Sequence, residues 1–438
     1  MRSAGAAPPA SSRHALALRL QEVVKAHESA RPEAAAASAE AAARVPFPYE
    51  NALLGLLPQG ERCALLRATL AYGPPALQAW QSFQDSVGDV EAYFEQDETG
   101  CKGLLPLLEA SFDRNGIGAA RSLRSYVRRC VQLEELRGEL YESVLEECVR
   151  TLDAAGVYPL LLKSSALAVT VGPQTALRAG HAIDLLLHPN QMADALEALC
   201  SGGFCAEAAG PGLAAHRHLR HPSGLAVGVH SRLFMLPQFD IRGAQLRQRR
   251  RAVALHDRDL LVISPEDCLL HLCGHGLYPP GEGNLRWLCE AYYLLQLTPD
   301  LNWRQLVATA IEARLAAPLF ILLRWLRDTL SVPMPLGYLA ELERASRQLD
   351  GLATEAICLS LVRSTRGWRR TSIALSGDLR QMWGLVRFGI LPSADYLRWQ
   401  NNVGTAVSPA RLHARRLYRI VQRLAAPRPG HPQWIAGR

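Results

Sequence analysis

The sequence predicts a helix-rich α+β protein in which a small mixed β-sheet is flanked by N-terminal and C-terminal helical regions. Two observations lead to this fold class. Apolar residues recur at steps of three and four before about residue 156 and after about residue 263, which is the pattern of amphipathic helices. Between these positions, short apolar runs alternate with only one or two helical stretches, which favours a small sheet covered by helices.

These changes of pattern divide the 438-residue chain into five parts. The first, residues 1–45, is rich in Ala, Pro and Ser and is expected to be disordered, because it offers little apolar surface to bury. The others are an N-terminal helical region (46–155), the sheet-containing core (156–263), a C-terminal helical domain (264–424) and a loose tail (425–438).

Local signals set the expected elements of the core. The helix that precedes it carries one apolar stripe and is expected to end at Gly156, because glycine readily adopts the positive φ of a helix end. Ser264 followed by Pro265 predicts the start of the next helix, with the serine as its cap. The stripe consists of Leu133, Leu136, Leu140, Val144, Cys148 and Leu152, the expected strands are 157–162, 182–187, 225–229 and 260–263, and a helix is expected over 189–202.

Composition argues against several classes of protein. The hydrophobic fraction of 49% and the charged fraction of 20% are ordinary for a globular protein, and the net charge of +7 is modest. The ten cysteines include no Cys-x-x-Cys pair, so a zinc site of that type is not expected. The N-terminus has no apolar signal sequence, and the most apolar run, Leu315–Leu323, is too short to span a bilayer. We therefore expect a cytoplasmic protein with no membrane partner.

Four short segments carry the residues that point to a function. They are Leu161–Ala168 (LLKSSALA), Arg178–Leu187 (RAGHAIDLLL), Val227–His230 (VGVH) and Ser264–Leu272 (SPEDCLLHL). Together they resemble the uncharacterised bacterial nucleotidyltransferase family of the polymerase-beta-like superfamily. In that family the first segment contains Leu-Lys-Gly, and the second contains Arg followed, after three residues, by Asp-Ile-Asp. The third segment reads Val-Glu-Leu-His, and the fourth begins with Ser-Pro-Glu-Asp. A fifth segment, Leu285–Glu290, resembles a family segment that usually ends in Asp.

The resemblance implies a site for a nucleoside triphosphate and two Mg²⁺ ions. Nucleotidyl transfer displaces pyrophosphate, and divalent ions held by three carboxylates screen the phosphates and activate the attacking oxygen. Two of these carboxylates form an Asp-x-Asp on one strand, where residues two apart share a face, and the third comes from a neighbouring strand. Small residues after the first strand let the triphosphate approach the N–H groups at a helix start.

This sequence departs from the family pattern at the carboxylates. Asp184 matches the second Asp of the pair, but Ala182 stands at the first position. Gly228 stands at the position of the third carboxylate, and Ser164 replaces the glycine after Lys163. By resemblance, Asp184 is the remnant metal ligand, Lys163 and Arg178 are the other candidate catalytic residues, and the candidate nucleotide-binding residues are Lys163, Ser164, Ser165, Arg178 and His230.

Several interpretations of this departure remain open. Catalysis is lost while the fold persists as a binding or scaffold module, or Glu207, Asp240 or a histidine replaces the missing ligands. A shifted alignment and an unusual one-metal or metal-free chemistry are the remaining options. The residues that still match also have purely structural interpretations. In these, Asp184 holds a loop, Arg178 forms an ion pair with Asp184, and Lys163 is a solvated loop cation.

Two further clusters suggest alternatives. A group of histidines offers nitrogen ligands for a transition metal, although no spacing among them is diagnostic. A run of arginines before the last expected strand is interpreted as a solvated helix end rather than a nucleic-acid contact, because no aromatic residues are interleaved with it. The histidines are His216, His218, His221 and His230, with His181 and His188 beside Asp184, and the arginines are Arg247, Arg249, Arg250 and Arg251.

Three functional hypotheses follow. The first is an accessory protein of a specialised bacterial pathway that has a degraded two-metal site and binds a nucleotide or a protein partner. The second is an active Mg²⁺-dependent nucleotidyltransferase that acts on a small molecule or peptide. The third is a helical interaction scaffold without a ligand. Nucleic acid is not expected as a partner in any of them.

Overall fold

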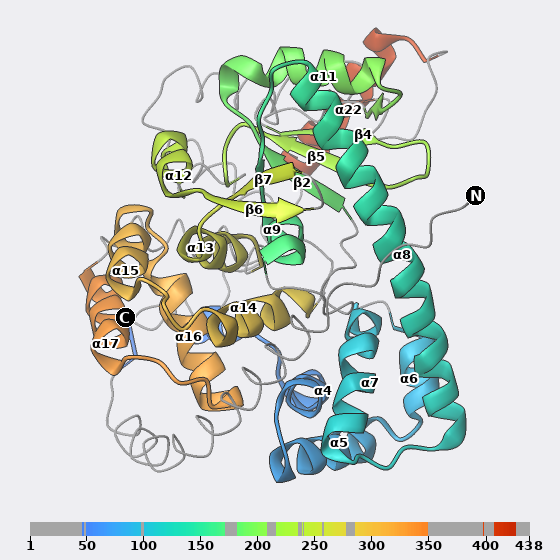
Figure 1. Ribbon diagram of the computed structural model, residues 1–438, viewed down its shortest axis with the longest axis vertical. Coiled ribbons are helices and arrows are strands. Elements are labelled where there is room, and N and C mark those ends of the chain that lie inside the picture. Colours follow the sequence, from blue (N-terminus) through green and yellow to red (C-terminus); the bar gives the residue numbers. More distant parts are fainter. Residues whose placement is uncertain are drawn as a thin grey trace.

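A computed structural model describes the chain over residues 46–47, 50–97, 100–170, 182–207, 216–234, 239, 241–255, 258–276, 285–348, 397 and 407–425. Within these ranges the chain is a helix-rich α+β protein with a mixed sheet, as the sequence predicts. Figure 1 shows helices on both sides of the sheet, and the buried apolar side chains of sheet and helices form one continuous core. The division at residues 156 and 263 stays a prediction, and the segment expected to be disordered lies outside the described residues.

Helices make up both flanking regions. Before the sheet come α3 (Glu50–Leu54), α4 (Gly60–Leu70), α5 (Pro74–Val87), α6 (Val90–Glu95), the 3-10 helix η1 (Cys101–Leu104), α7 (Leu105–Asn115) and α8 (Arg121–Ala154). After it come α13 (Pro265–Gly276), α14 (Arg286–Leu297), α15 (Trp303–Glu312), α16 (Ala316–Leu330), α17 (Leu336–Gln348) and α22 (Pro409–Ala425). Between the strands lie α9 (Lys163–Thr170), η2 (Pro189–Gln191), α11 (Met192–Ser201) and α12 (Gly243–Arg249). In the described part of the chain, no helix has both the length and the apolar character needed to cross a bilayer.

Seven strands form the sheet in the order β3-β4-β5-β2-β1-β7-β6. β2 runs parallel to β5 and β1 runs parallel to β7, while the other neighbouring strands are antiparallel. In the view of Figure 1, α11 lies above the sheet and α9 and α13 lie below it. The strands are β1 (Leu160–Leu161), β2 (Ala182–Leu186), β3 (Cys205–Ala206), β4 (His216–Arg220), β5 (Ala226–His230), β6 (Arg251–Leu255) and β7 (Arg258–Val262).

Three of these strands are missing from the sequence prediction. β3, β4 and β6 lie toward the two edges of the sheet, where one face can remain in water and no continuous apolar run is needed. β4 shows the reason most clearly, because Leu219 is its only aliphatic residue. The prediction of a strand over 157–162 is wrong in length, since only Leu160 and Leu161 pair with neighbouring strands and Tyr158 is exposed.

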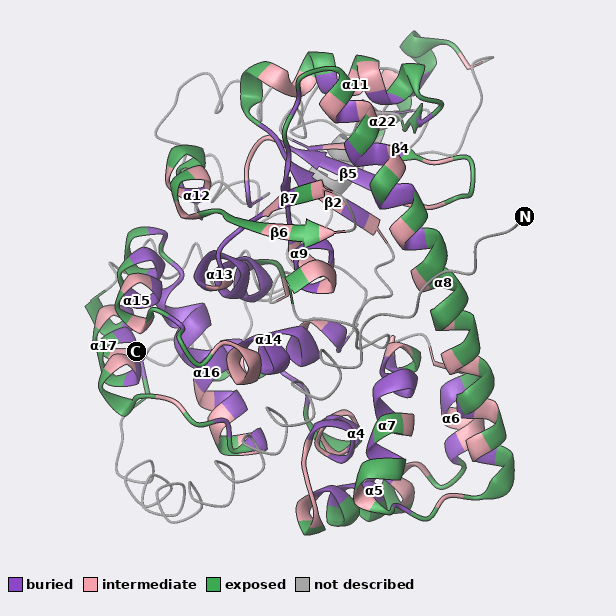
Figure 2. Cartoon of the chain, in the orientation of Figure 1, coloured by how far each residue is buried: buried purple, intermediate pink, exposed green. Residues whose placement is uncertain are grey.

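The long helix α8 buries only part of the stripe that the sequence predicts. The C-terminal half of the stripe, from Val144 to Leu152, lies in the core, whereas Leu133 and Leu136 are 57% and 62% exposed. Figure 2 shows that the middle of α8 is largely exposed between the N-terminal helices and the sheet. The helix ends as predicted, because Gly156 has a φ of +72° and the Val157 N–H donates back to the Leu152 carbonyl.

A buried ion pair joins α12 to the start of α13. Ser264 caps α13 as predicted, accepting a hydrogen bond from the Asp267 N–H at 3.2 Å and donating to the Asp267 carboxylate at 3.0 Å. Arg249 donates two hydrogen bonds to this carboxylate, at 3.0 and 2.6 Å. The interpretation of the arginine run as solvated is therefore wrong for Arg249, because a fully buried carboxylate requires a partner. It holds for Arg250 and Arg251, which are exposed.

Replacing Arg249 with alanine is expected to lower the free energy of unfolding by about 3 kcal/mol, because the substitution leaves the Asp267 carboxylate buried without its cation. Urea denaturation measures the change. Arg251→Ala, at an exposed position two residues away, is the matched control and should change the stability by less than about 0.5 kcal/mol. Equal stability of the two variants would show that the ion pair does not stabilise the fold.

Candidate functional site

The centre of the sheet brings most of the candidate residues onto one face. Ala182 and Asp184 are two residues apart on β2 and therefore share a face. β5 runs beside β2 with Gly228 next to Asp184, and His230 lies two residues further along the same face. β4 continues this surface on the other side of β5, with His216 directly opposite His230.

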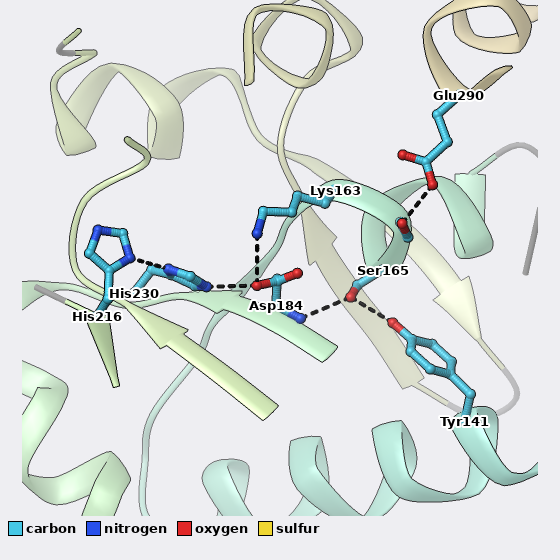
Figure 3. Close-up of polar contacts among 8 residues, drawn as sticks. Tyr141, Lys163, Ser165, Asp184, His216, His230 and Glu290 are labelled. Atoms are coloured by element: carbon cyan, nitrogen blue, oxygen red, sulfur yellow. Dashed lines mark hydrogen bonds and ion pairs between the residues drawn. The ribbon is translucent and has the colours of Figure 1, made fainter. Parts of the chain in front are cut away.

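Asp184 is held by two donors that share one carboxylate oxygen (Figure 3). The Lys163 ammonium lies 3.1 Å from Asp184 Oδ1, and Nε2 of His230 lies 2.8 Å from the same oxygen. The side chains of Lys163 and Asp184 are only 19% and 13% exposed, so water screens their attraction less than that of a surface pair. Lys163 is therefore an ion-pair partner in this structure rather than a solvated loop cation.

The hydrogen bonds determine the protonation states of this cluster. Burial raises the pKa of Asp184, but the Lys163 charge and the hydrogen bond from His230 outweigh it and hold the pKa of Asp184 well below its usual range. Because an ionised carboxylate only accepts hydrogen bonds, Nε2 of His230 carries a hydrogen. Burial lowers the pKa of His230 despite the neighbouring carboxylate, so the ring is neutral and its Nδ1 is an acceptor.

His216 completes a chain of hydrogen bonds that starts at Lys163. Nδ1 of His216 is hydrogen-bonded to Nδ1 of His230 and is the donor, since the His230 nitrogen accepts. Burial, together with the neighbouring His230 ring and the Lys163 charge, lowers the pKa of His216 to about 3. Both ring nitrogens of His230 are used within the protein. A metal ion can bind His230 only if this chain is broken.

A second set of contacts fixes the backbone around Asp184. The Ser165 hydroxyl oxygen accepts hydrogen bonds from the Asp184 N–H at 3.0 Å and from the Tyr141 hydroxyl of α8 at 2.6 Å. The Asp184 carbonyl accepts from the Leu162 N–H at 3.0 Å. Burial raises the pKa of Tyr141, so its phenol stays protonated and donates. Three elements, α8, α9 and β2, are therefore joined at Asp184.

The turn from β1 into α9 directs Lys163 toward β2. Lys163 has a φ of +47°, a left-handed conformation that is uncommon for a residue other than glycine. Such a conformation is retained where the surrounding contacts require it. Here α9 begins at this residue, and the ammonium reaches back to Asp184.

Ser164 contacts a buried glutamate at the start of α9. The Ser164 hydroxyl donates to Oε1 of Glu290 at 2.6 Å, and Nε of Arg286 lies 3.4 Å from the same oxygen. Burial raises the pKa of Glu290, although the Arg286 charge opposes this effect. The carboxyl group of Glu290 thus occupies the helix start where the family resemblance expects phosphate. A ligand that uses the Ser164 hydroxyl must displace it.

The described residues do not fit a pair of Mg²⁺ ions. Mg²⁺ requires oxygen ligands in near-octahedral geometry, but no group of three or more His, Cys, Asp or Glu side chains within the described ranges is arranged to hold a metal ion. Glu207, considered as a replacement ligand, pairs instead with Arg220 at 2.7 Å near the edge of the sheet. Asp240, the other acidic candidate, lies outside the described residues.

Gly228, where the family resemblance expects a third carboxylate, is closely surrounded by the side chains of Asp184 and His230. A Cβ atom added to Gly228 would lie 2.8 Å from Nε2 of His230 and 2.9 Å from Oδ1 of Asp184. These distances are too short for real Cβ contacts. The absence of a side chain at Gly228 is therefore what allows Asp184 and His230 to meet.

The other residues singled out in the sequence do not all join this site. Arg178 and His181 lie outside the described residues. His218 is exposed on β4, and His221 lies near Glu147 instead of Asp184. Three participants were not predicted as site residues: His216 appeared only in the histidine group, Glu290 only as the end of a family-like segment, and Tyr141 had no signal at all.

Comparison with known proteins assigns the chain to a family. The model of the uncharacterised nucleotidyltransferase family matches residues 101–331, which is more than half of the chain. The chain therefore belongs to this family. The match begins at η1 and ends just after α16, so it includes α8, the whole sheet and the helices that carry Glu290 and Arg286. No curated protein and no solved structure matches the chain significantly.

Gly228→Ala is expected to separate Asp184 from His230, because the added methyl group would overlap both side chains. We expect the free energy of unfolding to fall by about 2 kcal/mol through overpacking and the lost hydrogen bond, as measured by urea denaturation. Gly138→Ala in α8 is the matched control, since a Cβ there meets no atom within 4 Å and alanine favours a helix by about 0.5–1 kcal/mol. A Gly228→Ala variant as stable as the native chain would contradict this packing.

The buried histidines are expected to make stability depend on pH. Burial lowers the pKa values of His216, His230 and His271, so the unfolded chain binds more protons than the folded chain below about pH 6.5. The free energy of unfolding should therefore fall from pH 7 to pH 5, with a slope of at most about 1.4 kcal/mol per pH unit for each histidine, reached between its folded and its unfolded pKa. His216→Gln should reduce this slope, whereas His218→Gln, at an exposed position, should not. Equal slopes in the two variants would contradict the assignment.

Proposed function

We propose that the chain is a nucleotidyltransferase-family protein that binds a nucleotide at a degraded two-metal site without transferring it, as an accessory protein of a specialised bacterial pathway. A polymerase-beta-like relationship is part of the same proposal. The observation that supports it most is the sharing of one oxygen of Asp184 by Lys163 and His230. A carboxylate that holds a metal gives its oxygens to the ion, whereas this one is already balanced by an ammonium group.

The missing ligands remove the chemistry of transfer. Ala182 and Gly228 have no side-chain oxygen, so nothing at these positions brings a divalent ion to the phosphates or to an attacking hydroxyl. What remains is a lysine ammonium at the start of α9, together with Arg178, which the family pattern expects beside it. Cations of this kind bind phosphate groups without polarising them for displacement.

His230 acts on a ligand only through Asp184 in this proposal. Its Nε2 donates to the carboxylate and its Nδ1 accepts from His216, so neither nitrogen is free to exchange a proton with substrate. Its contribution is to hold Asp184 in one orientation. Asp184 in turn sets the position of the Lys163 ammonium that meets the ligand.

We expect the protein to bind nucleotide without converting it. With Mg²⁺ and each of the four common ribonucleoside triphosphates, the purified protein should release no pyrophosphate above background. Calorimetric titration should still detect nucleotide binding, with the same affinity in Mg²⁺ and in EDTA, because no pair of ions is bound with it. Robust turnover that disappears in Asp184→Asn would instead establish an active Mg²⁺-dependent transferase. Absence of all nucleotide binding would favour the scaffold.

Two substitutions distinguish a lysine site from a metal site. Lys163→Met should weaken nucleotide binding about tenfold, the effect of losing one charge-assisted hydrogen bond. Lys102→Met, at an exposed lysine of η1, is the matched control and should have no effect. Asp184→Asn should strengthen binding, because the amide oxygen can still position Lys163 as a hydrogen-bond acceptor but no longer competes with phosphate as an anion. Loss of binding in this variant would instead indicate a metal ligand. The thermal midpoint of each variant shows that it is folded.

A further inference from the structure

Helix α22 separates its arginines from its apolar side chains. With about 3.6 residues per turn, all of its arginines fall on one half of the helix and nearly all of its apolar residues on the other. The helix contains no Asp or Glu. The arginines are Arg411, Arg415, Arg416, Arg419 and Arg423, and the opposite half consists of Ala410, His413, Ala414, Leu417, Tyr418, Ile420, Val421, Leu424 and Ala425.

Most of the described side chains on the apolar half of α22 are exposed, and His413 is partly buried. Leu417 is 44% exposed and Tyr418 is 64% exposed, and Ala410 and Ala414 are exposed as well. The buried apolar residue is Leu412, 4% exposed, which lies among the arginines on the other half. Arg411 and Arg415 are exposed too, so described side chains from both halves of this helix, red in Figure 1, are open to solvent. An amphipathic helix of a globular protein normally turns its apolar half toward the core instead.

The sequence around α22 has the strongest positive charge in the chain. After Val362 there are fourteen arginines and two aspartates, with no lysine or glutamate, whereas the residues up to Val362 have 34 basic and 39 acidic side chains. Four of the eight tryptophans also lie after Val362. The net charge of +7 therefore comes entirely from this last part. An anionic partner would be attracted to this part and not to the rest of the chain.

We infer that α22 is an interfacial helix that binds the surface of an anionic lipid membrane. At such a surface the apolar half enters between the headgroups, where its side chains leave water. The arginines extend to the lipid phosphates and pair with them. Nucleic acid would satisfy the arginines but leave Leu417 and Tyr418 in water. Tyr418 lies at the border of the two halves, where a ring with a polar tip fits the headgroup region. The expectation of no membrane partner considered only spanning segments, and an interfacial helix requires none.

Sedimentation of the full chain with vesicles tests this inference. The protein should sediment with vesicles of phosphatidylcholine and phosphatidylglycerol at low salt, far less with phosphatidylcholine alone, and should be released from the anionic vesicles at high salt. Absence of sedimentation with anionic vesicles at low salt would overturn the inference.

Paired variants show whether both halves of α22 are used. Leu417→Glu with Tyr418→Glu should lower the vesicle partition coefficient at least about tenfold, and Arg411→Gln with Arg415→Gln should lower it about fivefold for each arginine. Leu133→Glu with Leu136→Glu in α8 is the matched control, because these leucines are similarly exposed and should not contribute. Unchanged thermal midpoints confirm folding, since all six positions are exposed.

Two outcomes would overturn the lipid assignment in favour of simple charge attraction. One is vesicle binding that is lost in the arginine pair but unchanged in the Leu417 and Tyr418 pair. The other is binding of duplex DNA in preference to vesicles, again without dependence on Leu417 and Tyr418. Both results would leave the apolar half of α22 without a role in binding.

Discussion

One oxygen of Asp184 is the point on which the central part of the structure depends. A carboxylate in so little water must be balanced, and Lys163 supplies the charge while His230 supplies a second donor. The turn that places Lys163 adopts a left-handed backbone conformation, and α9 starts directly from it. The position of β5 beside β2, the start of α9 and the orientation of His230 are therefore determined together.

This arrangement balances the charge of Asp184 within the protein itself. Without a neighbouring cation, a carboxylate with so little exposure to water would carry an uncompensated negative charge. Here the lysine that follows β1 takes that role, and the space next to Gly228 is closed by the contact between Asp184 and His230. Glu290, which meets Ser164 and Arg286, is balanced separately. In the described site, each of these two buried carboxyl groups therefore lies beside a positively charged side chain of the protein.

The candidate site and the surface of α22 differ in how their charged side chains are arranged. At the site, charges are buried and each has a partner, so that a ligand must compete with contacts inside the protein. On α22, arginines and apolar residues lie on opposite halves of the helix, and Leu417 and Tyr418 on the apolar half are exposed. The first arrangement favours a small ligand that replaces existing hydrogen bonds. The second favours an extended surface that offers negative charge and an apolar layer at once.

Local signals were sufficient for much of the fold. Apolar runs predicted β2, β5 and β7, the Pro-to-Gly spacing predicted α11, and Ser264 and Gly156 correctly marked a helix start and a helix end. Each of these features depends on residues a few positions apart, whose effects on backbone conformation are local. The lack of a side-chain oxygen at Ala182 and Gly228 is likewise evident from the sequence, because residue identity alone decides whether an oxygen is present.

The tertiary structure alone decided which residues meet. Tyr141 and Ser165 are 24 positions apart, and Asp184 and His230 are 46 apart, so their contacts depend on helix docking and strand register. Periodicity likewise showed that Leu133 lies on the apolar stripe of α8 but not that this half of the stripe stays uncovered. The sequence determined the local conformation and the chemical groups that are present. The packing of distant elements determined their partners, because a hydrogen bond forms only where the fold brings both atoms within reach.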